Sequence, residues 1–225
     1  MSNTDNPLVA GLYDPVMAIP ERTVLRPHRE ALVADLAGDV LDLGAGTGAL
    51  FQYVESRDVT SVCAVEPDPG MRRQAIERAE DLSADITVTA GDAQALPYDD
   101  RSFDAVIASF ALCTIPDHEQ ALAEVARVLR GGGEFRFLEH VRGDGLSGRV
   151  HDLLAPGWHA VAGGCHLNRE TDRLLLGDDR FRTISFERTD GLTDTLLPVV
   201  RGRLERQRSD GGGTLDRVVA GLTGT

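Results

Sequence analysis

The sequence predicts an α/β fold built around a mainly parallel sheet. Short apolar runs alternate with helical stretches along most of the chain, which is the pattern of successive strand–helix–strand units. One of these runs, residues 40–43, leads directly into Gly44, Gly46 and Gly48, as in folds that bind a nucleotide where a strand ends. The length of 225 residues fits one large domain, or one domain with a small cap. Together these observations indicate a single Rossmann-like domain with helices on both faces of the sheet.

Seven segments have the composition of strands. Five of them lie in the first 140 residues, at 40–43, 61–65, 86–89, 103–108 and 134–138, and the last of these follows the glycine run 131–133. Two more lie near the end of the chain, at residues 182–188 and 196–204. Helices are expected within residues 8–36, at 71–79 and at 119–129, and the third of these has one apolar stripe made of Leu122, Val125, Ala126 and Leu129.

Residues 142–176 interrupt the alternation of strands and helices. Because this segment directly follows the fifth expected strand, we interpret it as a small inserted cap over the carboxyl ends of the strands. The domain is expected to span residues 1–206, with the cap inside it. Residues 207–225 contain a glycine run near their start and are expected to form a loosely ordered tail.

The charge of the chain is strongly negative. The formal net charge is -13 and the isoelectric point is about 4.8. Every basic residue is arginine, and the sequence contains no lysine. A net anionic surface repels phosphate backbones, so a nucleic-acid partner is not expected. Dispersed acidic residues without lysine indicate adaptation to high salt, because salt screens the repulsion between the negative charges. The alternative is that this composition reflects an arginine-rich genome.

Nothing in the sequence indicates export or membrane insertion. No apolar run approaches the length of a membrane span, and the polar residues 1–7 carry neither a signal peptide nor a lipidation motif. A cytoplasmic location without an integral membrane segment is therefore expected. Cys63, Cys113 and Cys165 are far apart and odd in number, so no disulfide framework is indicated.

Three acidic residues accompany the glycine loop. Asp42 lies inside the first strand, where a buried carboxylate is costly unless it serves a partner such as the ammonium group of a ligand. Glu66 ends the second strand and can accept both hydroxyls of a ribose. Asp92 follows the third strand, where its carboxylate can accept from an adenine amine while the Ala93 N–H donates to a ring nitrogen. The full set of expected cofactor residues is Asp42, Gly44, Ala45, Gly46, Gly48, Glu66, Pro67, Asp92, Ala93 and Ser109.

This set describes a nucleoside with an amino-acid tail rather than a dinucleotide. The pyrophosphate fingerprint G-x-G-x-x-G is not met, because Phe51 stands where a third small residue is required. A nicotinamide-dependent oxidoreductase on the same fold is therefore the weaker alternative. In a purely structural interpretation, Asp42 and Glu66 cap helices and Asp92 starts a turn.

At these motifs the sequence resembles the class I S-adenosylmethionine-dependent methyltransferases with a methyltransferase type 11 domain. DLGAGTG resembles the first motif of that family, VEP its second-strand acid, and GDAQALPYDDRSFDAV its adenine loop and fourth strand. RVLRGGGEF resembles the segment that leads into the fifth strand, although Arg130 stands where the family usually has proline. The resemblance covers residues 40 to about 188. It implies S-adenosylmethionine as cofactor and a seven-stranded sheet whose last strand is antiparallel.

A more specific resemblance lies in LCTIPDHEQALAEVARVLRGGGEFRFLEHVR and PGWHAVAGGCHLNRET. Both segments are similar to a subfamily of small-molecule methyltransferases, which includes the thiol methyltransferases of animal endoplasmic reticulum and prokaryotic relatives. The animal members carry an N-terminal membrane helix, which this chain lacks, so membrane association does not carry over. The resemblance implies methyl transfer to a small-molecule acceptor, which is a thiol, a quinone-like or a lipid-like compound.

A base for the acceptor is expected at the end of the fifth strand, where His140 stands and Glu139 precedes it. Methyl transfer from a sulfonium is an in-line displacement, so the protein mainly supplies approach geometry and a dry site. A thiol ionises with little help, whereas a phenol or an amine needs a base such as His140, oriented by Glu139. The other residues expected around the acceptor are Tyr13, Cys113, Trp158, His159, Cys165, His166, Asn168 and Arg169.

Each of these assignments has a structural alternative. Glu139 and His140 can cap a loop, and Cys113 can be a small buried apolar residue. Trp158 can belong to the core of the cap. The histidines and the cysteine of the cap fit no closed zinc pattern, so no metal is expected. At the level of function, the alternative from another class is a regulatory protein that binds S-adenosylmethionine without catalysis.

Overall fold

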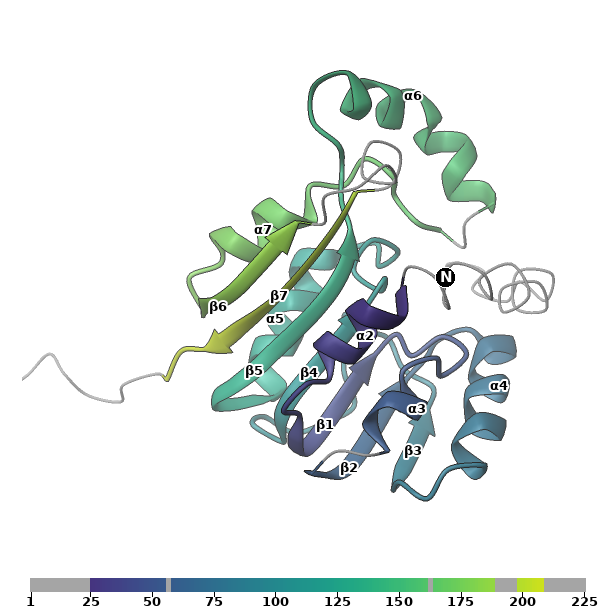
Figure 1. The fold of residues 1–225 in the computed structure, drawn as a ribbon, viewed down its shortest axis with the longest axis vertical. Coiled ribbons are helices and arrows are strands. Elements are labelled where there is room, and N and C mark those ends of the chain that lie inside the picture. The colour runs from purple at the N-terminus through teal and green to yellow at the C-terminus, as the bar shows by residue number, and fades with distance from the viewer. Residues whose placement is uncertain (1–24, 56–57, 162–163, 189–197, 209–225) are drawn as a thin grey trace, which may run out of the picture.

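A computed structural model describes residues 25–55, 58–161, 164–188 and 198–208 of the chain. Its centre is a seven-stranded sheet in the order β3-β2-β1-β4-β5-β7-β6 (Figure 1). The first five strands are parallel, whereas β7 is antiparallel to both of its neighbours. This confirms the mainly parallel sheet with an antiparallel last strand. The strands are β1 (Ala37–Leu43), β2 (Asp58–Val65), β3 (Ile86–Thr89), β4 (Phe103–Ser109), β5 (Leu129–His140), β6 (Phe181–Arg188) and β7 (Val199–Arg206).

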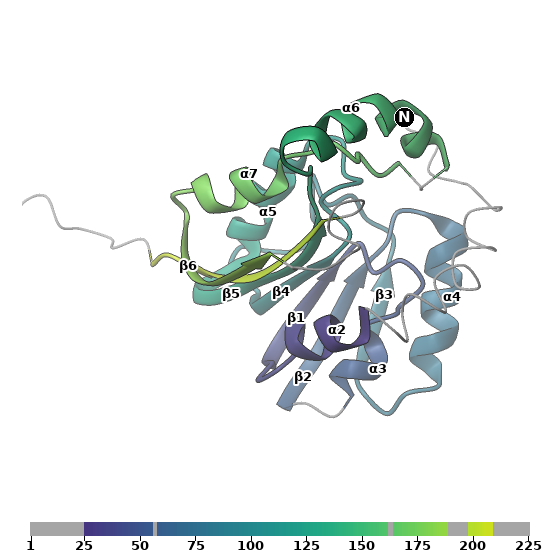
Figure 2. The ribbon, with the colours of Figure 1, turned by 45° about the horizontal axis from the view of Figure 1, so that its top comes forward.

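Helices cover both faces of the sheet (Figure 2). They are α2 (Arg26–Leu32), α3 (Phe51–Val54), α4 (Pro69–Glu80), α5 (His118–Val128), α6 (Gly145–Val161) and α7 (Thr171–Gly177). Apolar residues of α2 and α3 pack with one set of sheet residues, and those of α5 and α7 pack with the opposite set. Helix α4 contributes Ala75 to a smaller cluster that shares Ile86 with the α2–α3 layer. Two apolar layers therefore enclose the sheet.

Strand β1 shows how the sequence assigns its side chains to these layers. Successive side chains of a strand point to opposite faces. Val40 accordingly packs with the α2–α3 layer and Leu41 with the α5–α7 layer, where Leu43 also lies. The same alternation directs the Asp42 carboxylate toward the face that α2 covers.

The carboxyl ends of four parallel strands lie level with one another. Leu43 of β1 pairs with Val65 of β2 on one side and with Ala108 of β4 on the other, and Val65 pairs with Thr89 of β3. Residues that follow these four positions therefore emerge at the same edge of the sheet. Ligands of open α/β sheets bind at this carboxyl edge.

The fifth strand differs from its prediction. Strand β5 begins at Leu129 and includes the glycine run that was expected to precede it. Its pairing with β4 shifts register, since Phe103 faces Leu129 but Ala105 faces Glu134. Glycine tolerates such a bulge, and Gly132 takes a positive φ of 88°. The preceding helix consequently ends at Val128, because Leu129 already has extended backbone angles.

The segment expected to be a cap contains two helices that lie in different places. Helix α6 lies beyond the carboxyl ends of the strands, whereas α7 packs against the face of the sheet that α5 also covers (Figures 1 and 2). Leu175 of α7 is buried in the same cluster as Phe181 of β6. After β7, Gln207 donates its backbone N–H to the carbonyl of Arg180.

Some expectations lie outside the described residues. These include the helical segments before residue 25, the position of Tyr13 and the tail from residue 209. Across the ranges that are described, no helix has the length and apolar character to span a membrane.

Candidate functional site

The glycine loop after β1 forms one wall of the carboxyl edge. Gly44, Gly46 and Gly48 all have positive φ, between 58° and 80°, which strains any residue with a β-carbon. A β-carbon on Gly44 would lie 2.8 Å from that of Ala111, so the chain passes close to the loop after β4. Around Gly46, by contrast, no described residue apart from its chain neighbours places an atom within 4 Å of such a β-carbon. The loop therefore packs tightly at its start and less tightly against the described residues at Gly46.

Asp42 is buried near the end of β1, and its Oδ2 atom has no hydrogen-bond partner among the described residues. Burial raises the pKa of this carboxyl to about 7, with Arg29 opposing the shift and Glu66 adding to it. A buried carboxylate oxygen without a partner is costly unless a ligand supplies a donor. The assignment of a ligand's ammonium group to Asp42 therefore stays a prediction.

Arg29 of α2 is a site residue that the sequence reasoning missed. Only 4% of it is exposed, and its guanidinium donates to Ser109 Oγ at 3.1 Å. Ser109 ends β4, next to the strand that carries Asp42. The helix thus places a cation at the carboxyl edge, between two of the predicted cofactor residues. Nothing in the local sequence distinguishes Arg29 from the other arginines of the chain.

Glu66 connects the loops that follow β1 and β2. It is buried, and its two carboxylate oxygens accept the N–H groups of Gly46 and Asp68, each at 2.8 Å. Burial raises the pKa of Glu66, while these two backbone donors lower it. Asp68, rather than Glu66, caps helix α4 by accepting the N–H of Met71. Pro67 lies between them, and its carbonyl accepts from the Arg72 side chain at 3.0 Å.

Asp92 and Ala93 follow β3, at the far end of the same edge. Asp92 is exposed, and both of its carboxylate oxygens accept from the side-chain amide of Gln94, at 2.8 and 3.0 Å. Ala93 is buried. Asp92 also begins a turn, as in the purely structural interpretation of this residue, because the Ala95 N–H donates to the Asp92 carbonyl.

Phe110 marks a sharp change of direction after β4. This aromatic residue has a φ of 58°, a conformation that costs a bulky side chain of the order of 1–3 kcal/mol. Its N–H donates to the carbonyl of Leu138 at 2.8 Å, so the turn remains attached to β5. The turn leads residues 111–113 over the end of β5.

Glu139 holds this turn, which corrects its predicted role. The carboxylate is fully buried and accepts the backbone N–H groups of Ala111, Leu112 and Cys113 at 3.0, 2.9 and 3.3 Å. Burial raises the pKa of Glu139 to about 7, although these three donors favour the ionised form. Glu139 does not orient His140, because adjacent residues of a strand point to opposite faces.

His140 ends β5 with 5% of its surface exposed. Neither of its ring nitrogens makes a hydrogen bond within the described part of the chain. Its ring lies 6.1 Å from that of His151 on α6, and that second imidazole accepts the N–H of Gly143. His140 is therefore a buried imidazole beneath α6, and it lies close enough to the Cys165 sulfur to lower the pKa of that thiol.

The segment after α6 is fastened to the turn after β4. Arg169 donates to the carbonyls of Leu112 and Ile115, at 2.7 and 2.5 Å. His166 N–H donates to the carbonyl of Cys113 at 2.9 Å. Cys165 is half-buried beside Cys113, and the pKa of Cys165 is lowered by the Cys113 thiol and then by His140 and Trp158. The structure thus brings five predicted acceptor residues together: Cys113, His140, Trp158, Cys165 and Arg169.

Three other predicted acceptor residues lie toward the surface. The ring of His159, which is exposed, lies 4.7 Å from that of the half-buried His166. Asn168 is exposed, and its side chain favours the ionised form of Asp152 on α6. These side chains make contacts within the cap itself.

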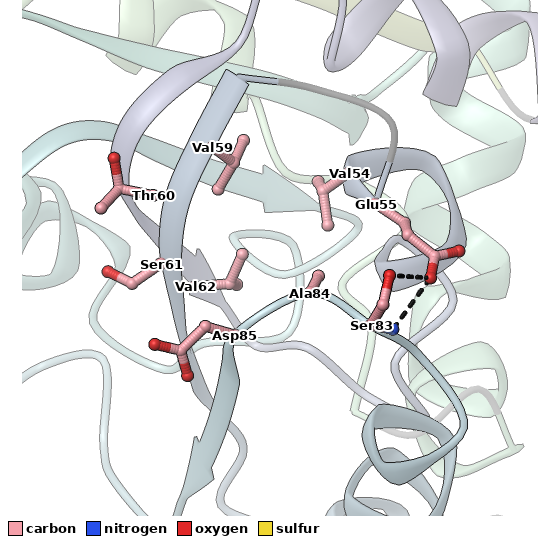
Figure 3. Close-up of a pocket in the computed structure, with 9 residues that line it drawn as sticks. All are labelled: Val54, Glu55, Val59, Thr60, Ser61, Val62, Ser83, Ala84 and Asp85. Atoms are coloured by element: carbon pink, nitrogen blue, oxygen red, sulfur yellow. Dashed lines mark hydrogen bonds between the residues drawn. The ribbon is translucent and has the colours of Figure 1, made fainter.

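A cavity of about 360 Å³ lies at the opposite edge of the sheet (Figure 3). It is lined by the start of β2 and by residues 83–85, which precede β3. At its rim, Glu55 accepts the backbone N–H and the hydroxyl of Ser83, both at 2.9 Å. None of the predicted cofactor or acceptor residues lines this cavity. It lies at the amino ends of the strands, where open α/β sheets do not bind their cofactors.

Comparisons with known proteins agree with this geometry. Residues 41–137 match the family model described as a methyltransferase domain. Thiol S-methyltransferase TMT1A of Homo sapiens is 30% identical over 169 residues, which cover 73% of this chain and 68% of that protein. Ubiquinone/menaquinone biosynthesis C-methyltransferase UbiE of Methylobacterium nodulans is 34% identical over 183 residues, which cover 75% of this chain and 71% of that protein.

Solved structures show the same fold. A structure of geranyl diphosphate methyltransferase in complex with SAM aligns with a TM-score of 0.69 at 15% identity and covers 87% of this chain and 91% of that one. The relatives named are methyltransferases, which decides between the methyltransferase and the nicotinamide-dependent alternative. The chain belongs to the S-adenosylmethionine-dependent methyltransferases, and S-adenosylmethionine is its methyl donor.

Proposed function

We propose that this enzyme transfers the methyl group of S-adenosylmethionine to a small-molecule thiol, in the space between the carboxyl edge of β4 and β5 and helix α6. The observation that carries the proposal is the buried His140, whose two ring nitrogens have no partner within the described residues. A buried polar group without a partner is costly and points to a ligand. His140 would lie on the acceptor side of the carboxyl edge, because β5 is two strands away from the β1 that carries Asp42.

The cofactor residues fit S-adenosylmethionine. Asp42 would hold its ammonium group, Glu66 its ribose hydroxyls, and Asp92 and Ala93 its adenine. Gly44, Ala45, Gly46 and Gly48 would line the tail, with Pro67 and Ser109 at the neighbouring strand ends. Among the described residues, Oδ2 of Asp42 has no partner and no neighbour crowds Gly46, and both observations support this arrangement. When bound, the sulfonium supplies an electrophilic methyl group, which a nucleophile takes in line.

His140 would accept the proton of the acceptor on a ring nitrogen. A thiol has an ordinary pKa of about 8.5, so a neighbouring imidazole removes its proton easily near neutral pH. Leu167 is buried and the half-buried Trp158 lies beside Cys165, and both would exclude water from the site. The similarity to a thiol S-methyltransferase over 73% of the chain supports a thiol acceptor.

A quinone-like acceptor is the second candidate, because a quinone-biosynthesis C-methyltransferase is similar over 75% of the chain. Formation of S-adenosylhomocysteine with equal concentrations of an alkyl thiol, a reduced quinone and a lipid-like amine separates these possibilities. We expect turnover with the thiol. Turnover with the quinone alone would contradict the thiol proposal, and absence of turnover with every acceptor would favour a regulatory protein without catalysis.

Replacement of Glu66 by alanine is expected to weaken S-adenosylmethionine binding by about 1.5–3 kcal/mol, the range for hydrogen bonds that involve a charged group. Isothermal titration of the variant and the parent measures the loss. Glu55→Ala is the matched control, because Glu55 also accepts two hydrogen bonds, from Ser83, but at the opposite edge. Equal affinities of Glu66→Ala and the parent would show that Glu66 does not hold the ribose.

We also propose that the enzyme functions in a cytoplasm of high ionic strength, because its composition is acidic and contains no lysine. At low ionic strength the net charge of -13 destabilises the folded state through self-repulsion. We expect thermal melts in dilute buffer and in molar KCl to differ strongly, with folding and activity favoured by salt. A melting temperature that does not depend on salt would favour genome composition as the origin of the charge.

A further inference from the structure

Two cysteines from distant parts of the sequence lie together near the carboxyl ends of β4 and β5. Cys113 belongs to the turn after β4 and Cys165 to the segment after α6, and both are free thiols. The hydrogen bond from His166 N–H to the Cys113 carbonyl, at 2.9 Å, joins the two segments directly beside the thiols. Cys165 is the residue before His166, so this bond brings the two cysteines side by side, and their side chains interact with each other.

The two thiols differ in burial and in reactivity. Cys113 is only 1% exposed, whereas Cys165 is half-buried and open to a small reagent. The pKa of Cys165 is lowered by the Cys113 thiol, and then by the side chains of His140 and Trp158. The pKa of Cys113 is raised by its contact with Cys165 and by burial. Cys165 therefore supplies a thiolate and Cys113 the neighbouring thiol, as in pairs of an attacking and a resolving cysteine.

We propose that Cys113 and Cys165 form a reversible dithiol–disulfide switch that hydroperoxides oxidise. The thiolate of Cys165 attacks the terminal oxygen of the hydroperoxide, which breaks the O–O bond and gives a sulfenic acid and an alkoxide, and the alkoxide takes a proton from water to become the alcohol. The sulfur of Cys113 then attacks the Cys165 sulfur, and the S–S bond forms as hydroxide leaves and takes the Cys113 proton to become water. A dithiol reductant restores both thiols by exchange.

The bond would change the acceptor site, and this consequence rests on the proposed function. Cys165 faces His140, and the disulfide replaces its thiolate by a neutral sulfur. The same bond joins the Glu139-anchored turn covalently to the segment that carries Arg169. An acceptor near His140 would then meet a neutral disulfide in place of a thiolate and a thiol.

Mass spectrometry of the whole protein tests the bond without using activity. After treatment with hydrogen peroxide we expect loss of two hydrogen atoms, one alkylatable thiol, and a proteolytic peptide pair that joins Cys113 to Cys165. Cys63→Ser is the matched control and should still form the bond. Cys113→Ser should instead leave a sulfenic acid on Cys165 that dimedone traps. Three unchanged thiols in the parent, or a bond that uses Cys63, would overturn the proposal.

Turnover of the oxidised protein tests the switch. We expect methyl transfer to a monothiol to be lost in the disulfide form and restored by dithiothreitol, with mass spectra before and after the assay to verify the bond. Full turnover by a protein that keeps the disulfide would overturn the switch. Absence of turnover in both states would contradict the proposed function alone, because the mass measurement still decides whether the bond forms.

Discussion

Replacement of Asp42 by asparagine is expected to weaken S-adenosylmethionine binding by about 2–5 kcal/mol, the cost of truncating one partner of a buried charge pair. This corresponds to a loss of affinity between roughly 30-fold and several thousand-fold. The reason is that Oδ2 of Asp42 is buried without a partner in the part of the chain that the structure describes, so an ammonium group of the ligand would meet an otherwise unpaired oxygen. Isothermal titration of the variant and the parent measures the difference.

The same pair gives binding a characteristic pH dependence. Burial raises the pKa of Asp42 to about 7 in the free protein, so the carboxyl is largely protonated below that pH. An ammonium group favours the ionised form, and binding must therefore release a proton from Asp42 at acidic pH. We expect the affinity of the parent to rise with pH up to about 7 and then to level off. The asparagine variant should show no such rise.

A stability measurement separates a binding defect from misfolding. Because the pKa of Asp42 is raised above its unfolded value of 3.8, its contribution to stability is present at low pH and is lost as the pH rises through about 7. Asparagine does not ionise, so the free variant should gain stability relative to the parent above pH 7. A variant that unfolds more easily than the parent at pH 8, or binds equally well, would contradict the assignment.

The sheet could be predicted from the sequence because its signals are local. The alternation of apolar runs with helical stretches predicts β1 to β4. The antiparallel last strand is predicted by the family resemblance alone. Strand β5 was predicted too short, since glycines were taken as a break between elements. The structure shows that they form a bulge within the ladder, which depends on the partner strand β4 rather than on the run itself.

The cofactor side was easier to predict than the acceptor side for a related reason. Asp42 and Glu66 lie at strand ends within continuous motifs, and parallel strands bring such ends to one edge. Arg29 reaches this edge from α2 through Ser109, a contact between residues 80 positions apart that no motif records. The Glu139 carboxylate serves the backbone of a turn formed by Phe110, whose positive φ no sequence signal predicts.

Pairs of adjacent residues show a further limit of sequence reasoning. In the sequence, His140 looks like a base and the preceding Glu139 like the acid that orients it. In a strand they face opposite ways, and the acid is occupied by three backbone N–H groups. The thiol whose pKa His140 lowers, Cys165, is separated from it by helix α6 in the sequence and approaches it only in the folded chain.

Replacement of His140 by alanine is expected to lower turnover about a hundredfold or more, as loss of a general base does, while the affinity for S-adenosylmethionine stays unchanged. Cofactor binding is spared because Asp42 and Glu66 lie on β1 and after β2, two or more strands from β5. His118→Ala is the matched control, since His118 begins α5 and has no place in the proposed mechanism. Steady-state kinetics with isothermal titration of each variant measures both quantities.

The pH dependence of this loss identifies the nucleophile. A thiol acceptor with a pKa of about 8.5 ionises without help at higher pH, so the difference between His140→Ala and the parent should shrink as the pH passes that value. An acceptor with a much higher pKa, such as a phenol, would keep the difference constant across the same range. A variant as active as the parent at neutral pH would remove His140 from the mechanism. In that case the buried, unpartnered imidazole would require a structural explanation, and the acceptor would have to ionise before it enters the site.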